Sequence, residues 1–182
     1  MGELLLLEAL GPRIMICGPS SNGKSTLALA IGRKTGWPVV HLDQLRHLPA
    51  TDWVQRPDEE FAALHAAAIE PDFWVMEGNY SRLMPPRLAR ATGIVLLGAN
   101  RWANLWRYFG RTLFQRQRQG TLEGLTRERL KWSMIHWILV TSPRNLRQYR
   151  EALPRSGLPM IEVTNLRELN ALYTAWGLDR HP

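Results

Sequence analysis

The sequence holds a single cysteine, Cys17, so the chain can form no internal disulfide. A protein that does without disulfides fits a reducing compartment. Runs of apolar residues long enough to cross a membrane are also missing. The apolar residues 4–7 lie between Glu3 and Glu8, and this segment is too short and too acidic for a signal peptide. We therefore expect a soluble, cytoplasmic protein with no membrane partner.

Clusters of cysteine and histidine are missing as well. Four of the histidines are scattered along the chain without metal-ligand spacing, namely His41, His47, His65 and His136. A zinc site is therefore not expected. The sequence has no repeat, no low-complexity run and no linker rich in Pro, Gly or Ser. Its length of 182 residues fits one domain over residues 1–182, large enough for a hydrophobic core.

Acidic residues are scarce in one region. Residues 101–155 contain twelve Lys or Arg against three Glu, a net charge of +9, so the rest of the chain carries −2 of the total of +7. Eleven of the twelve basic residues are Arg, which suits bidentate contacts to phosphate. Two interpretations follow: a lid that closes on nucleotide phosphates, or a surface that holds nucleic acid.

The chain is organised around a phosphate-binding loop. The apolar run Arg13 to Cys17 is followed by Gly18-Pro19-Ser20-Ser21-Asn22-Gly23-Lys24-Ser25-Thr26, which fits the pattern G-x-x-x-x-G-K-[ST]. The glycines permit backbone conformations in which successive N–H groups wrap a phosphate at the start of a helix. Lys24 adds a positive charge for the outer phosphates, and the Ser25 hydroxyl can bind Mg²⁺. Residues 18–26 are the predicted nucleotide site.

Strands and helices alternate along the rest of the chain. Apolar runs predict strands at residues 13–17, 39–43, 73–76, 93–97 and 160–163. Helical patterns separate them, including residues 24–35, a helix that begins at Pro57, and a closing helix over 166–176. This order predicts an α/β fold with a mainly parallel sheet and helices on both faces.

Two carboxylates are expected near the phosphate-binding loop. Asp43 ends the second predicted strand and Glu77 follows the third. In open α/β sheets, ligands bind at the carboxyl ends of the strands. Asp43 can orient an acceptor hydroxyl or take its proton, or else cap the segment that follows it. Glu77 can hold a water bound to Mg²⁺ opposite Ser25, act as a general base, or remain a solvated acid.

Arginines supply further candidates. Arg107 and Arg111 lie one turn apart on the polar side of a predicted helix, where they can stabilise charge on a transferred phosphoryl group or simply face water. Arg118 lies on the same side. Arg82 and Arg87 are candidates for holding a phosphate on the acceptor, if the acceptor carries one.

The sequence resembles a known group of proteins. The phosphate-binding loop is followed by His41-Leu42-Asp43, by Glu77-Gly78-Asn79-Tyr80-Ser81 and by Pro86-Arg87-Leu88-Ala89-Arg90-Ala91. Together these segments resemble the adenylate-kinase-like P-loop proteins, and among them the bacterial DNA-topology-modulation (FlaR-type) proteins. The resemblance extends from about Ile14 to Trp106.

The resemblance implies a three-layer α/β/α fold with a five-stranded parallel sheet and an arginine-rich helical lid around residues 101–155. It also implies ATP and Mg²⁺ as cofactors, with residues 18–26 on the ATP phosphates and Ser25 and Glu77 near the metal. We expect a Mg²⁺-dependent phosphotransferase acting on a small molecule, with Lys24, Asp43, Glu77, Arg107 and Arg111 as catalytic residues. The alternative is a nucleic-acid-associated regulator of DNA topology or gene expression that is switched by ATP.

Overall fold

The computed structural model describes residues 5–20, 22–51, 53–98, 104–106, 108–110 and 132–180. Five strands form one parallel sheet in the order β2-β3-β1-β4-β5. They are β1 (Arg13–Cys17), β2 (Val39–His41), β3 (Trp74–Glu77), β4 (Gly93–Leu97) and β5 (Met160–Val163). The strand that precedes the phosphate-binding loop, β1, is therefore central, between β3 and β4. This arrangement confirms the predicted α/β fold.

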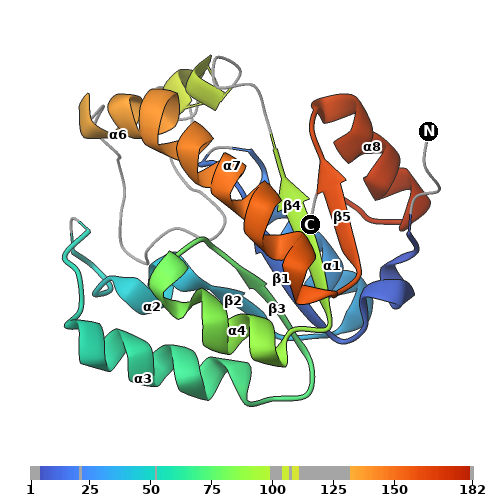
Figure 1. Cartoon of the computed structure of the whole chain (residues 1–182), viewed down its shortest axis with the longest axis horizontal. Helices are drawn as coiled ribbons and strands as arrows, with labels where there is room; N and C mark the ends of the chain where they lie inside the picture. The colour runs from blue at the N-terminus through green and yellow to red at the C-terminus, as the bar shows by residue number, and fades with distance from the viewer. Residues whose placement is uncertain are drawn as a thin grey trace.

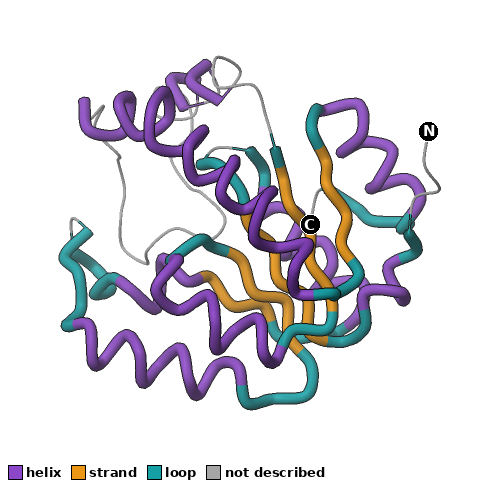
Figure 2. Tube along the Cα trace, in the orientation of Figure 1, coloured by secondary structure: helices purple, strands orange, loops and turns teal. Residues whose placement is uncertain are grey.

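Helices cover both faces of the sheet (Figure 1). The longer ones are α1 (Lys24–Thr35), α3 (Asp58–Ile69), α7 (Ser142–Ala152) and α8 (Leu166–Ala175), and the shorter ones are α2 (Leu42–Arg46), α4 (Met84–Arg90) and α6 (Trp132–His136). Single turns are also present: η1 (Leu7–Leu10), η2 (Ser81–Leu83), the π-helical η3 (Trp137–Thr141) and η4 (Leu153–Ser156). Figure 2 shows the strands gathered at the centre of the helices. None of the helices described in this structure could cross a membrane.

The core has two layers, one on each face of the sheet. Alternate residues of β1 point to opposite faces: Ile14 and Ile16 pack with α1, α8 and η1, whereas Met15 and Cys17 pack with α2, α3, α4 and α7. All five residues of β4 are buried, as expected for a strand that is covered on both faces. Residues 7–10, beside the amino-terminal leucine run, contribute Leu7 and Leu10 to the first layer.

Local signals in the sequence account for several helix ends. The first turn of α3 holds Asp58, Glu59 and Glu60, where carboxylates stabilise the positive end of the helix dipole. Gly36 ends α1 in the left-handed conformation with φ +74°, as glycine commonly does at this position. The amide of Asn165 caps α8, with its Oδ1 accepting from Glu168 N at 3.0 Å.

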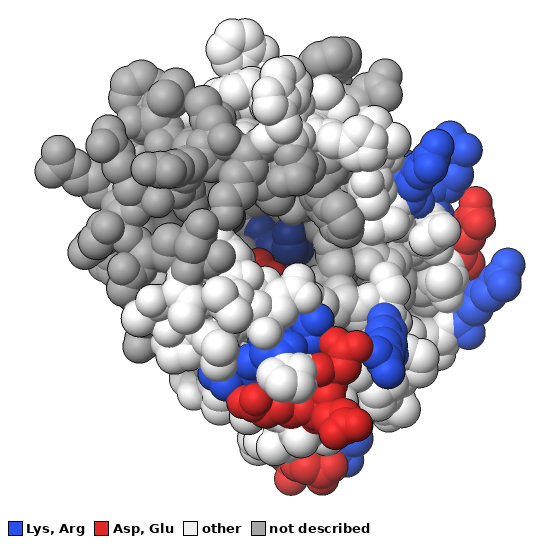
Figure 3. Space-filling view, turned by 90° about the vertical axis from the view of Figure 1, so that its left-hand side faces the viewer, with Lys and Arg blue, Asp and Glu red and all other residues white. Residues whose placement is uncertain are grey.

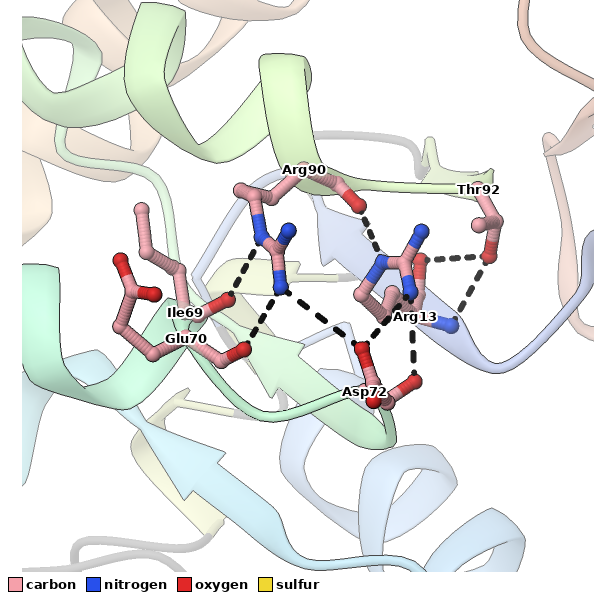
Figure 4. A network of polar contacts seen from close by, with 6 residues as sticks. All are labelled: Arg13, Ile69, Glu70, Asp72, Arg90 and Thr92. Atoms are coloured by element: carbon pink, nitrogen blue, oxygen red, sulfur yellow. Dashed lines mark hydrogen bonds and ion pairs between the residues drawn. The ribbon is translucent and has the colours of Figure 1, made fainter.

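Two arginines tie the amino-terminal edge of the sheet to the helices beside it (Figure 4). Arg90, at the end of α4, donates to the carbonyls of Ile69 and Glu70 at the end of α3, at 3.2 and 2.6 Å. Arg13, at the start of β1, donates through Nε to Arg90 O at 2.5 Å. This network lies at the edge opposite the carboxyl ends of the strands and therefore serves the fold.

Candidate active site

The phosphate-binding loop joins β1 to α1 at the carboxyl edge of the sheet. Gly18 has φ +137°, and a Cβ there would lie 2.0 Å from Leu97 O, so only glycine fits beneath the end of β4. Gly23 precedes α1 at φ +92° and offers no side chain to cap it. The first amides of a helix have no carbonyl partner within it. The amides at the start of α1 can therefore bind a phosphate.

Side chains within the loop fix its shape. Asn22 is 4% exposed and donates through Nδ2 to Leu97 O at 2.6 Å, which anchors the loop to the end of β4. Lys24 Nζ donates to Pro19 O at 2.8 Å, so its ammonium group lies over the loop. Burial raises the pKa of Cys17 to about 11, so this thiol stays protonated and serves as a packed core residue. Of the predicted nucleotide site, Ser21 lies outside the described residues.

Glu77 lies at the centre of the candidate site. In the parallel register it stands beside Ile16 of β1 and His41 of β2, on the face of the sheet where α1 packs. Its side chain is buried, and its Oε1 accepts from Ser25 Oγ and from His41 Nδ1, each at 2.9 Å. Glu77 therefore joins the phosphate-binding helix to the end of β2. Glu77 proves to be the last residue of β3, where the sequence placed it just beyond the strand.

The carboxyl group of Glu77 is ionised. Burial by itself raises its pKa, but the hydrogen bond from His41, the charge of Lys24 and the hydrogen bond from Ser25 together lower it below the ordinary value. An anionic carboxylate and a hydroxyl are the hard oxygen ligands that Mg²⁺ prefers. Among the described residues, no group of three or more acidic, His or Cys side chains could hold a metal alone. Ser25 and Glu77 thus fit a Mg²⁺ that takes its other ligands from phosphate and water.

Asp43 is the second carboxylate that the sequence analysis singled out. The strand prediction of 39–43 was too long, because β2 ends at His41 and the chain turns at once into α2, with Asp43 in its first turn. Its Oδ1 accepts from the hydroxyl of Tyr80 at 2.6 Å. Burial, followed by the charge of Asp43, raises the pKa of Tyr80, so this hydroxyl remains a donor. Asp43 is therefore oriented by a residue that follows β3.

The two arginines considered for an acceptor phosphate have other partners. Arg87 is 0% exposed, and its guanidinium donates to Gly78 O and Asn79 O at 3.3 and 2.5 Å. The prediction for Arg87 was wrong, because α4 lies against the sheet and directs the side chain inward under the loop after β3. Burial lowers the pKa of Arg87 to about 10. Arg82 is exposed and pairs with Asp58 at 2.6 Å.

The arginines predicted for the lid, Arg107, Arg111 and Arg118, lie outside the described residues. His41 was missed by the sequence reasoning, which searched for histidines at metal-ligand spacing. Its partner Glu77 is 36 residues away and reaches it only through strand register. The sequence did contain one indication of this pair: His41 and Glu77 each lie at the end of a strand near the phosphate-binding loop.

The surface on one side of the molecule is hollowed. Figure 3 shows a hollow with Lys or Arg atoms and Asp or Glu atoms on its floor, and further charged side chains of both signs on the surface below it. Arg46, the last residue of α2, pairs with Asp58 at 2.7 Å, donates to Gln55 at 2.7 Å and lies over the ring of Phe61.

Sequence comparison finds a local match. The family model described as isopentenyl transferase matches residues 13–50. An adenylate dimethylallyltransferase from Rhizobium rhizogenes is 49% identical over 35 residues, which are 19% of this chain and 14% of that protein. The matched part holds the phosphate-binding loop, β2 and α2. It spans about a seventh of the relative, too little to place the chain in that family.

Structural comparison extends over nearly the whole chain. A gluconokinase from Sinorhizobium meliloti 1021 has a TM-score of 0.58 at 16% identity, covering 92% of this chain and 91% of that one. A shikimate kinase from Acinetobacter baumannii, in complex with shikimate, has a TM-score of 0.52 at 14% identity, covering 92% of each chain. A shikimate kinase from Bacteroides thetaiotaomicron has a TM-score of 0.50 at 15% identity, covering 90% and 94%. The chain therefore has the α/β fold of P-loop kinases.

Proposed function

We propose that this protein is an ATP-dependent, Mg²⁺-requiring phosphotransferase that acts on a hydroxyl group of a small molecule. The observation that carries the proposal is the placement of two carboxylates beside the phosphate-binding loop, each oriented by a hydrogen-bond donor. Glu77 is held by Ser25 and His41, and Asp43 by Tyr80. A carboxylate on the metal side and another on the acceptor side are what phosphoryl transfer requires.

Each residue would have a separate task. The backbone amides of residues 20–26 would bind the β- and γ-phosphates, and Lys24 would move from Pro19 O toward the phosphate oxygens. Ser25 and Glu77 would hold Mg²⁺, which, when bound, neutralises charge on the phosphates. Asp43 would accept the proton of the acceptor hydroxyl as the hydroxyl oxygen attacks the γ-phosphorus, and the bond from that phosphorus to the β,γ-bridging oxygen would break with ADP as the leaving group. Arg107 and Arg111, which lie outside the described residues, would stabilise charge on the transferred phosphoryl group.

The comparisons support the kinase class at the level of the fold. Gluconokinase and shikimate kinase are named for small hydroxylated acids, so this fold carries small-molecule kinases in those proteins. The resemblance to the topology-modulation proteins stays a prediction, as does the cytoplasmic location.

The test is ATP- and Mg²⁺-dependent phosphorylation across a panel of nucleosides, nucleotides, polyols and hydroxy acids, including gluconate and shikimate. Product formation is followed by mass spectrometry. Lys24→Ala and Asp43→Asn should each lower the rate by at least about 100-fold, whereas Lys34→Ala, at an exposed lysine of α1, should not change it. Activity that survives in Lys24→Ala would refute the proposal. Because of the local match, transfer of a dimethylallyl group to adenylate is assayed beside the panel.

A regulator that binds nucleic acid and uses ATP as a switch is the second candidate. It is favoured by the +9 charge of residues 101–155 and by two tryptophans of that segment, Trp106 and Trp132, which are 77% and 84% exposed. Exposed aromatic rings among basic residues can stack on bases. A gel shift with DNA at increasing salt tests this function. Binding at physiological salt that weakens when Arg107, Arg111 and Arg118 become Ala would support it, and no binding would exclude it.

A further inference from the structure

The loop between β3 and η2, residues 78–80, has an unusual backbone. Gly78 has φ +133° and Tyr80 has φ +43°. A bulky residue with positive φ is a strained outlier that persists only where its surroundings hold it in place. Such residues gather at functional sites. The contacts that hold Tyr80 in this conformation therefore point to what the loop does.

The first contact joins the loop to the phosphate-binding loop. The side-chain amide of Asn79 pairs with the backbone of Gly18 in both directions: Oδ1 accepts from Gly18 N at 3.0 Å and Nδ2 donates to Gly18 O at 3.0 Å. Two bonds to the backbone of one residue fix both the distance and the orientation of the pair. The position of Asn79 is thus set by the first residue of the phosphate-binding loop.

The second contact joins the loop to the acceptor side. Tyr80 reaches back to Asp43 Oδ1 at 2.6 Å, and its ring packs edge-on against Phe61, with 5.0 Å between the ring centres. With Oδ1 bound to the phenol hydroxyl, Asp43 would offer its other oxygen, Oδ2, to an acceptor. The direction of that oxygen depends on where Tyr80 stands.

A third contact stiffens the loop from below. The buried guanidinium of Arg87 donates to both Gly78 O and Asn79 O. Gly78 itself lies against α2, where a Cβ would meet Leu42 Cβ at 2.8 Å. Hydrogen bonds and packing therefore hold this short loop in place between Gly18 and Asp43.

We propose that Asn79 and Tyr80 are positioning residues that hold the acceptor carboxylate Asp43 in a fixed place relative to the phosphate-binding loop. A nucleotide that orders residues 18–26 would thereby also order α2 and Asp43. The inference rests on the proposed function, because it assumes that the nucleotide binds at residues 18–26 and the acceptor near Asp43. It adds that the two halves of the site are joined through residues 78–80.

Hydrogen–deuterium exchange of the full chain, with and without ATP and Mg²⁺, tests this coupling without knowledge of the acceptor. In the unaltered protein, the nucleotide should slow exchange at residues 18–26 and also, by at least about threefold, at residues 42–46. An opening free energy raised by ~0.65 kcal/mol corresponds to that factor. Tyr80→Phe removes only the hydroxyl and should abolish the slowing at 42–46 while that at 18–26 remains. Asn79→Ala should also abolish the slowing at 42–46.

Ser81→Ala is the matched control. Its hydroxyl lies 3.2 Å from the hydroxyl of Tyr149 and contacts neither Gly18 nor Asp43, so this variant should behave like the unaltered protein. Two results would overturn the coupling but leave the proposed function intact. In the first, the nucleotide slows exchange only at residues 18–26 of the unaltered protein. In the second, exchange at residues 42–46 is still slowed in both Tyr80→Phe and Asn79→Ala. No slowing at residues 18–26 in the unaltered protein would overturn the proposed function, and the coupling with it.

Discussion

His41 Nδ1 lies 2.9 Å from Glu77 Oε1, so the last residue of β2 holds the last residue of β3. Both side chains are buried, and an ionised carboxylate can only accept, so the histidine is the donor. Ser25 donates to the same oxygen. Both of these bonds are made to Oε1, so Oε2 is the oxygen through which Glu77 would bind a ligand. His41 thus has the geometry of a residue that orients a metal-binding carboxylate.

Replacing His41 should weaken the effect of Mg²⁺ on nucleotide binding. Loss of a residue that orients a metal ligand commonly costs 10–100-fold in metal affinity. His41→Ala should therefore lower the Mg²⁺-dependent gain in ATP affinity by about tenfold, while the affinity measured in EDTA changes little. His41→Asn, whose Nδ2 lies close to the place of Nδ1, should retain most of the gain. Calorimetric titration with ATP, once in Mg²⁺ and once in EDTA, measures this gain in affinity. If His41→Ala showed the same gain as the unaltered protein, His41 would not orient Glu77 for Mg²⁺.

The buried histidine His65 of α3 should make the protein less stable in mild acid. Its side chain is 1% exposed, and burial, followed by the charge of Arg87, lowers its pKa to about 4 from 6.5. Below pH 6.5 the unfolded chain takes up a proton that the folded chain takes up only near pH 4. The free energy of unfolding therefore falls as the pH drops from 6.5 to 4, by roughly 1–3 kcal/mol for this group.

Urea unfolding at pH 7 and pH 5 measures this contribution. His65→Leu has no group to titrate, so its loss of stability between the two pH values should be smaller than that of the unaltered protein, by about 1–2 kcal/mol. His136→Leu, at an exposed histidine of α6, should lose as much as the unaltered protein does. Equal losses in all three proteins would show that His65 is protonated with the same pKa in both states.

The sequence was sufficient for the sheet because its strands are short apolar runs between clear helix signals. Gly18 to Thr26 could be assigned because each position has a local backbone reason. Contacts made across strands could not be read in this way. The pairing of His41 with Glu77 depends on which strands are neighbours and in what register. The inward turn of Arg87 depends on how α4 packs, which the pattern of a short helix does not specify.

Arg90 should contribute to stability without affecting ligand binding. Its guanidinium holds the last carbonyls of α3 and lies in the network of Figure 4, at the edge of the sheet away from the phosphate-binding loop. Charged hydrogen bonds of this kind, partly exposed, contribute about 1 kcal/mol. Arg90→Ala should lower the free energy of unfolding by this amount in urea, with unchanged ATP affinity. Arg155→Ala, at an exposed arginine, should cost less than about 0.5 kcal/mol. If Arg90→Ala lowered the free energy of unfolding no more than Arg155→Ala does, the network would not contribute to stability.

Two glycines with positive φ should respond differently to alanine. At Gly18 a Cβ would lie 2.0 Å from Leu97 O and 2.9 Å from Asn22 Nδ2, so the loop must move away from β4 and lose the pairing with Asn79. At Gly36 a Cβ meets nothing within 4 Å, and only the backbone strain of about 1–2 kcal/mol remains.

Gly18→Ala should therefore weaken ATP binding by at least about 100-fold, which is ~2.7 kcal/mol, because the amides no longer converge on one phosphate. Gly36→Ala should lower the melting temperature by about 3–5 °C and leave ATP binding unchanged, because α1 keeps its first turn. Calorimetric titration and thermal unfolding separate the two effects. If Gly18→Ala bound ATP as tightly as the unaltered protein, the nucleotide could not lie on this loop, since no arrangement keeps both the added methyl group and the contact with Leu97.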